Sequence, residues 1–175
     1  MNFLAKLATE AKAAGLEFLL IGGNAVIAYG SKRTTEDVDL LISEEQLGSW
    51  REFVTRFGYT AFVDYPSFVQ FTPPRGLMRL DLMLVSASTW AKMYAAREQR
   101  PLGDATFDVP AGVHIIALKL HALRQNPSRS TDWDDIEHLI DVCNIDVQGS
   151  EFRAIVSRYG SPSAYARILQ RNPPA

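Results

Sequence analysis

Apolar residues recur with two different spacings along this chain, and the change between them predicts where strands and helices lie. Alternation at every second residue is typical of strands, whereas apolar positions three or four apart are typical of helices. The first half of the chain mixes the two spacings, and from residue 88 onward helical spacing dominates. The predicted strands cover residues 17–21, 37–42, 60–65, 67–72 and 77–85.

Glycines and polar caps mark the ends of the predicted helices. Gly15 is expected to end an N-terminal helix, and Gly58 to end a helix that follows the second strand. Asn24 is expected to cap a short helix after Gly22-Gly23, and Thr131 to cap a later one. Further helices are predicted near 89–99, 112–125, 132–142, 150–159 and 162–171, with a short edge strand at 106–110.

These elements predict an α/β (α+β) fold in one domain that covers residues 1–175. Residues 1–87 form its α/β core, and residues 88–175 form a helical C-terminal subregion. A chain of this length buries roughly 68–70% of its unfolded surface, so it needs no disulfide or structural metal to form a core.

Composition and charge narrow the class of protein further. The chain has 18 Lys+Arg against 20 Asp+Glu, a net charge of −2, which argues against a protein that coats nucleic acid. Cys143 is the one cysteine, so no disulfide can form within the chain, and a reducing, cytoplasmic location is expected. No apolar run reaches about 18 residues, so no membrane association is expected.

Acidic residues occupy one face of two of the predicted strands. Because strand side chains alternate, Asp37 and Asp39 share a face, and Asp81 has the same position on a later strand. Two carboxylates about 6 Å apart repel by roughly 3 kcal/mol at an effective dielectric near 20. A divalent cation such as Mg²⁺ would remove that repulsion. In the alternative interpretation, Arg79, Arg33 or solvent compensates these charges.

The glycine pair that follows the first strand offers a second candidate site. Gly22 and Gly23 end a strand and open a helix, so their backbone N–H groups can point toward a phosphate. A side chain there would block a close approach of the anion. The alternative is that the two glycines only form a turn. Thirteen residues separate Gly23 from Asp37. A glycine pair and an acidic strand at this spacing are much less expected by chance than either motif alone.

The segment LIGGNAVIAYGSKRTTEDVDLLI, together with RLDLMLV, resembles the DNA polymerase β-like nucleotidyltransferase superfamily. The similarity covers residues 17–87 and is greatest to small bacterial enzymes of the AbiEii toxin type and to minimal nucleotidyltransferases. The resemblance implies a mixed β-sheet with helices on one face and a nucleotide site on the other. It implies that two Mg²⁺ ions bind, with Mn²⁺ as an alternative. The implied metal ligands are Asp37, Asp39 and Asp81, and the implied nucleotide-binding residues are Gly22, Gly23, Asn24 and Arg33.

The helical half contains a lysine in the middle of an apolar stripe. Lys119 has Ile115 and Leu123 one helical turn away on either side, so its charge needs a partner. In one interpretation its ammonium pairs with an acid. In the other, which the resemblance favours, Lys119 neutralises the triphosphate as a catalytic residue, and Asp132 and Asp135 also serve the nucleotide site. An alternative explanation for Asp132 and Asp135 is that the helix dipole favours acidic residues in the first turn of a helix.

The function predicted from the sequence is a Mg²⁺-dependent transfer of a nucleoside monophosphate from an NTP to an acceptor hydroxyl. The acceptor is left open between tRNA, as in toxin-type members, a protein side chain and a small molecule of the aminoglycoside type. A different class of function is a non-catalytic nucleotide-binding or partner-binding module of the same fold, such as one component of a toxin–antitoxin pair. In either case an antitoxin is a candidate partner.

Overall fold

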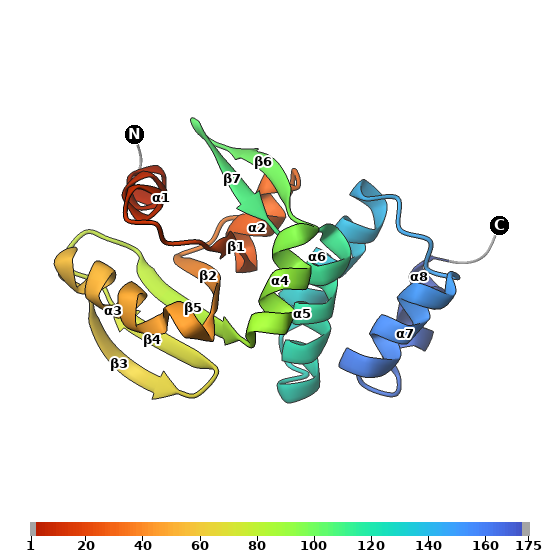
Figure 1. Ribbon diagram of the computed structural model, residues 1–175. Helices are drawn as coiled ribbons and strands as arrows, with labels where there is room; N and C mark the ends of the chain where they lie inside the picture. Colours follow the sequence, from red (N-terminus) through yellow and green to blue (C-terminus); the bar gives the residue numbers. More distant parts are fainter. Residues whose placement is uncertain (1–2, 173–175) are drawn as a thin grey trace. The chain divides into compact units, whose positions relative to one another are not determined.

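The computed structural model describes residues 3–172, which group into two compact units (Figure 1). The first unit contains the chain up to Ala28 together with Lys32–Pro110, and it holds the β-sheet. The second unit contains Tyr29–Ser31 together with the chain from Ala111 onward, and it is helical. Within the described residues, no helix has the length and apolar character needed to cross a membrane.

The elements of the first unit alternate between helices and strands. Its helices are α1 (Phe3–Ala13), α2 (Gly22–Ala28), the 3₁₀ turn η1 (Glu44–Gln46), α3 (Leu47–Arg56) and α4 (Ala87–Ala95). Its strands are β1 (Leu19–Leu20), β2 (Asp37–Ser43), β3 (Thr60–Tyr65), β4 (Phe68–Thr72), β5 (Arg79–Val85), β6 (Glu98–Leu102) and β7 (Ala105–Val109). The second unit contains α5 (Gly112–Gln125), α6 (Ser130–Val142), α7 (Ser150–Tyr159) and α8 (Ala164–Arg171).

Five strands form one mixed sheet in the order β1-β2-β5-β4-β3. β2 and β5 are parallel, and the other neighbours are antiparallel. This arrangement confirms the predicted mixed α/β fold. The register between the parallel strands places Asp37 opposite Arg79, and Asp39 opposite Asp81. The two predicted acidic strands are therefore neighbours.

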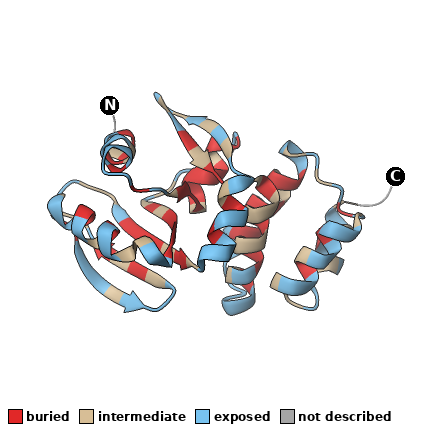
Figure 2. Ribbon diagram, in the orientation of Figure 1, coloured by how far each residue is buried: buried red, intermediate tan, exposed pale blue. Residues whose placement is uncertain are grey.

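The opposite face of the sheet forms the core of the first unit. Val38 and Leu40 of β2 and Leu80 and Leu82 of β5 are fully buried, as the alternation predicts. Figure 2 colours the buried positions of the chain red. Helices α1 and α3 contribute further buried apolar side chains, which include Leu7, Ala11, Trp50, Phe53 and Val54. With one face of the strands committed to the core, the acids are left on the other face.

Two predicted helix caps are wrong. Helix α2 begins at Gly22, because the carbonyl of Ile21 accepts from the N–H of Ala25, so Asn24 lies inside the helix. Its side-chain amide instead donates to the backbone carbonyl of Asp37, at 2.8 Å. Helix α6 begins at Ser130, which places Thr131 inside it as well. Short polar residues favour the N-cap position, but here other factors decide. Asn24 makes a tertiary hydrogen bond instead, and α6 begins one residue before Thr131.

The β6–β7 hairpin differs in part from the prediction. Its second strand confirms the short strand expected near 106–110, but its first strand covers residues for which helix was predicted up to 99. Helix α4 ends at Ala95, and the chain turns back at Gly103, which has φ of +63°. The Gly103-Asp104 pair is typical of a two-residue hairpin turn, and it was the signal available in the sequence.

Candidate functional site

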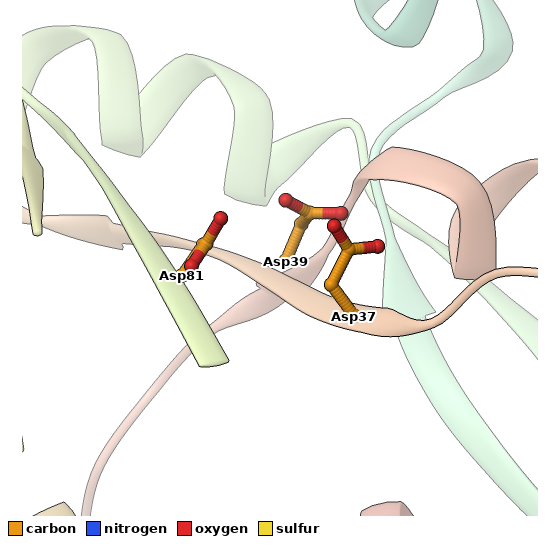
Figure 3. A group of neighbouring side chains, drawn as sticks. All are labelled: Asp37, Asp39 and Asp81. Atoms are coloured by element: carbon orange, nitrogen blue, oxygen red, sulfur yellow. The ribbon is translucent and has the colours of Figure 1, made fainter. Parts of the chain in front are cut away.

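Three aspartates from β2 and β5 lie together on one face of the sheet, opposite the face that carries Val38 and Leu40 (Figure 3). One carboxylate oxygen of each of Asp37, Asp39 and Asp81 lies within 4.8 Å of the others. The parallel register produces this arrangement, because it sets Asp39 directly beside Asp81 on the next strand. Parallel pairing thus brings together the acids that the sequence pattern placed on one face.

Asp37 accepts a hydrogen bond on each of its carboxylate oxygens. The hydroxyl of Thr35 donates to its Oδ1 at 2.8 Å, and Nη2 of Arg79 donates to its Oδ2 at 2.8 Å. Burial acts to raise the pKa of Asp37, but these hydrogen bonds outweigh it and lower that pKa below its ordinary value. Arg79 is therefore one of the compensating charges expected from the sequence, although it does not neutralise the whole group.

Asp81 is only 5% exposed, and its two carboxylate oxygens differ in environment. Nε2 of Gln70 donates to Oδ2 at 2.8 Å. Oδ1 has no hydrogen-bond partner within the part of the chain that the structure describes, and Nε of Arg79 lies 3.6 Å away. Burial raises the pKa of Asp81, because the ionised carboxylate has lost hydration that its neighbours only partly replace.

This donor set fits a hard divalent cation. Mg²⁺ prefers carboxylate oxygens and retains several waters, and here three carboxylates, two of them from half-buried residues, offer oxygens at close range. A buried oxygen without a hydrogen-bond partner requires a physical explanation, and a cation near Oδ1 of Asp81 would provide one. The three residues are therefore able to hold a metal ion between β2 and β5.

Gly22 and Gly23 lie beside these acids in positions that only glycine fits. Gly22 has φ of +62°, and a Cβ atom there would overlap with the carboxylate of Asp39. A Cβ atom at Gly23 would lie 2.8 Å from the hydroxyl oxygen of Thr35 and close to the guanidinium of Arg33. The backbone of this turn therefore directly adjoins the acidic group, as the sequence spacing predicts.

Gly22→Ala is expected to weaken nucleotide binding at least tenfold, because the new methyl group would displace the carboxylate of Asp39 and strain the backbone. The measurement is titration of the protein with Mg²⁺–ATP. The matched control is Gly30→Ala, where φ is +94° but a Cβ atom would meet no other atom within 4 Å. Equal losses in both variants would show that backbone strain, and not the position beside Asp39, causes the effect.

Asp81→Asn is expected to stabilise the metal-free protein at neutral pH. A raised pKa means that the folded state disfavours the ionised carboxylate, so the free energy of unfolding decreases as the pH rises through that pKa. The variant should match the wild type near pH 3 and have the higher Tm at pH 7. Mg²⁺ should raise the Tm of the wild type more than that of the variant. A variant less stable at pH 7 would contradict this account of Asp81.

Gln70 is a site residue that sequence reasoning missed. It lies opposite Asp81 because β4 pairs antiparallel with β5 in that register. Its strand was predicted, but nothing in the local sequence specifies which strand it would pair with. The only available signal was a polar residue at an alternating position between Val69 and Phe71, both of which are buried.

A second charged cluster lies in the helical unit. Nζ of Lys119 donates to Asp132 at 3.0 Å and to Asp135 at 2.6 Å, and all three residues are buried. Arg129 also donates to Asp132, while Asp134 is exposed. Burial acts to raise the pKa of Asp132, but Arg129 and Lys119 outweigh it and lower that pKa. Lys119 therefore has the acidic partners that the first interpretation required, and the roles of this cluster toward a nucleotide stay predictions.

Comparisons with known proteins place the fold. No protein-family model matches the sequence, and no curated protein matches it significantly. A crystal structure of ANT(2'')-Ia in complex with adenylyl-2''-tobramycin has a TM-score of 0.70 and 15% identity, over 90% of this chain and 97% of that one. A solution structure of the same antibiotic-resistance factor has a TM-score of 0.68 and 17% identity, and covers 97% and 94% of the two chains.

A third similar structure is the lincosamide antibiotic adenylyltransferase LnuA with lincomycin bound. Its TM-score is 0.62 at 14% identity, over 79% of this chain and 95% of that one. These likenesses show that the chain has the nucleotidyltransferase fold. At these identities the likenesses concern the fold alone, and they do not distinguish the AbiEii-type subgroup from others.

Proposed function

We propose that this protein is a Mg²⁺-dependent nucleotidyltransferase that moves a nucleoside monophosphate from an NTP to an acceptor hydroxyl and releases pyrophosphate. The observation that carries the proposal is the group of three aspartates on two parallel strands of this fold, one of which has a buried oxygen without a hydrogen-bond partner. Transfer of this type depends on positioning and on neutralising charge more than on a covalent intermediate.

Each part of the site has a role in this proposal. Asp37, Asp39 and Asp81 hold the metal, with two ions expected and Mn²⁺ as an alternative. The bound metal supplies charge neutralisation at the transferred phosphorus and lowers the pKa of the attacking hydroxyl. Asp81, whose buried Oδ1 would face the metal, helps to orient that hydroxyl through the bound ion. The nucleotide is bound by the turn of Gly22 and Gly23 together with Asn24 and Arg33. The resemblance assigns neutralisation of the triphosphate to Lys119 and a place in the nucleotide site to Asp132 and Asp135, and these roles stay predictions from the sequence.

A small molecule is the acceptor class that we favour. One of the two structures of ANT(2'')-Ia, which match over nine tenths or more of both chains, contains adenylyl-2''-tobramycin, and LnuA was solved with lincomycin. The chain spans at least nine tenths of each of those chains, so it has the size of proteins that act on such molecules. A tRNA acceptor, a protein acceptor and a toxin–antitoxin partnership stay predictions from the sequence alone.

Two measurements test the proposal together. Isothermal titration with ATP, GTP, CTP and UTP, each with and without Mg²⁺, should show metal-dependent binding of at least one nucleotide. Incubation with the corresponding α-³²P-labelled NTP should then transfer label to tobramycin, lincomycin, total tRNA or total cell protein. Binding without transfer to any acceptor would favour the non-catalytic module. No metal-dependent binding of any NTP would overturn the proposal.

A further inference from the structure

The face of the sheet that carries the three aspartates continues across β4 and β3. In this register Gln70 lies opposite Asp81, and Val63 lies opposite Gln70. The next row along the strands joins Met83, Phe68 and Tyr65 in the same way. Residues that pair across a sheet share a face. We call these five residues beyond Asp81 the β3–β4 platform: Val63, Tyr65, Phe68, Gln70 and Met83.

Solvent reaches this platform even though most of it is apolar. Tyr65 is 64% exposed, and the other four residues are half-buried. On the opposite face of the same strands, Val69 and Phe71 are buried in the core. An aromatic and aliphatic surface that stays accessible directly beside a charged site is typical of a ligand-binding surface.

The platform lies on the side of the aspartates away from the glycines. Across this face of the sheet, the residues follow in the order Gly22, Asp39, Asp81 and Gln70. Gly22 is placed next to Asp39 because a Cβ atom on Gly22 would overlap with that carboxylate. In-line displacement places the leaving pyrophosphate and the attacking hydroxyl on opposite sides of the phosphorus. If the triphosphate lies along the glycine turn, the hydroxyl must arrive from the Gln70 side, above the platform.

Charge on the platform restricts what can lie there. Residues 60–72 contain no Lys or Arg, and their one charged residue is Asp64. Asp64 lies opposite Val69, on the core face, where Nη2 of Arg51 is 2.6 Å from its Oδ1. A polyanion such as RNA binds mainly through cations that neutralise its phosphates, and this surface offers none. Exposed aromatic rings beside carboxylates instead suit a neutral or cationic molecule with an apolar ring face.

We propose that the β3–β4 platform is the acceptor site and that the acceptor is a neutral or cationic ring-bearing molecule. Its ring packs on Tyr65 and Phe68, and one of its hydroxyls faces Asp81. This inference rests on the proposed function, because it uses the direction of nucleotidyl transfer. It goes further in assigning acceptor recognition to residues of β3 and β4.

The test monitors the platform directly by NMR of methyl groups, with ¹³C-labelled Met and Val. The protein is first loaded with Mg²⁺ and a non-hydrolysable analogue of an NTP, each of the four NTPs being tried, and lincomycin, tobramycin or methyl α-glucopyranoside is then added. We expect at least one of these ring-bearing probes to shift the Met83 and Val63 methyl signals. Tyr65→Ala and Phe68→Leu should weaken that binding between about tenfold and a hundredfold, while affinity for the analogue is unchanged.

Asp64→Asn is the matched control, because it alters the same strand on the opposite face and should leave probe binding unchanged. The inference is overturned if the analogue binds but no probe shifts these methyl signals. It is equally overturned if Tyr65→Ala and Phe68→Leu bind the probe as the wild type does, or if total tRNA shifts the same signals in place of the probes. Failure of the wild type to bind the Mg²⁺–nucleotide analogue would instead overturn the proposed function, and this inference with it.

Discussion

Asp39→Asn is expected to reduce nucleotidyl transfer by at least about a thousandfold, the equivalent of about 4 kcal/mol of transition-state stabilisation. Asparagine keeps the shape of the side chain beside Gly22 and Asp81, but it removes one of the charges that would hold a cation. The direct measurements are label transfer from α-³²P-ATP and Mg²⁺ titration of the purified variant. Both should fail while the far-UV circular dichroism spectrum stays that of the wild type.

Asp64→Asn again supplies the control for the loss of one carboxylate from this sheet. Asp64 forms an ion pair with Arg51 on the core face, away from the three aspartates, so transfer should be unaffected. An Asp39→Asn protein that retains wild-type transfer would show that the carboxylate group does not bind an essential metal. The proposed function would then fail, whatever the similarity of folds.

Lys119→Met is expected to destabilise the protein by about 3–5 kcal/mol, because Asp132 and Asp135 would remain buried without their shared cation. Denaturant unfolding measures the loss. The exposed pair of Lys6 and Glu10 is the matched control, and Lys6→Met should cost less than about 1 kcal/mol. Adding Asp132→Asn and Asp135→Asn to Lys119→Met should restore much of the stability, since no buried carboxylate would then lack its cation and Arg129, which also pairs with Asp132, is exposed to solvent.

The same variant separates the two interpretations of Lys119. If its ammonium serves only the helical unit, unfolding changes but the affinity for Mg²⁺–ATP in the folded protein does not. A protein that keeps its stability and loses nucleotide affinity would contradict the structural role and support the phosphate-binding one. The triple variant allows nucleotide affinity to be measured in a protein with restored stability, and wild-type affinity there would show that neither Lys119 nor the two aspartates contact the nucleotide.

The individual strands of the five-stranded sheet were predictable from the sequence, because the alternation that identifies a strand is local. Val38 and Leu40 alternate with Asp37 and Asp39, and that period both identifies a strand and assigns its acids to one face. Most helices of the second half were predictable for a similar reason, since their apolar spacing persists over several turns. The acids of the candidate site therefore followed from a pattern within each strand, on the condition that β2 and β5 were neighbours.

Contacts between distant segments could not be predicted in the same way. The hydrogen bond from Gln70 to Asp81 depends on which strands pair, and that choice is made by the folding of the whole sheet. The side chain of Asn24 has the chemistry of a helix cap, and only tertiary structure shows that the carbonyl of Asp37 is its partner. Lys119 needed an acidic partner on any interpretation, but helical spacing alone did not identify Asp132 or Asp135.

The parallel pairing of β2 with β5 also has a consequence for folding. Asp39 and Asp81 are adjacent on neighbouring strands but belong to segments separated in sequence by α3 and the β3–β4 hairpin. Such non-local contacts form late, because closing the intervening loop costs entropy before the strands can pair. A cation that requires both carboxylates thus binds the completed sheet and not the unfolded chain, so its concentration shifts the folding equilibrium by mass action. A bound ion would then both take part in catalysis and stabilise the pairing of β2 with β5.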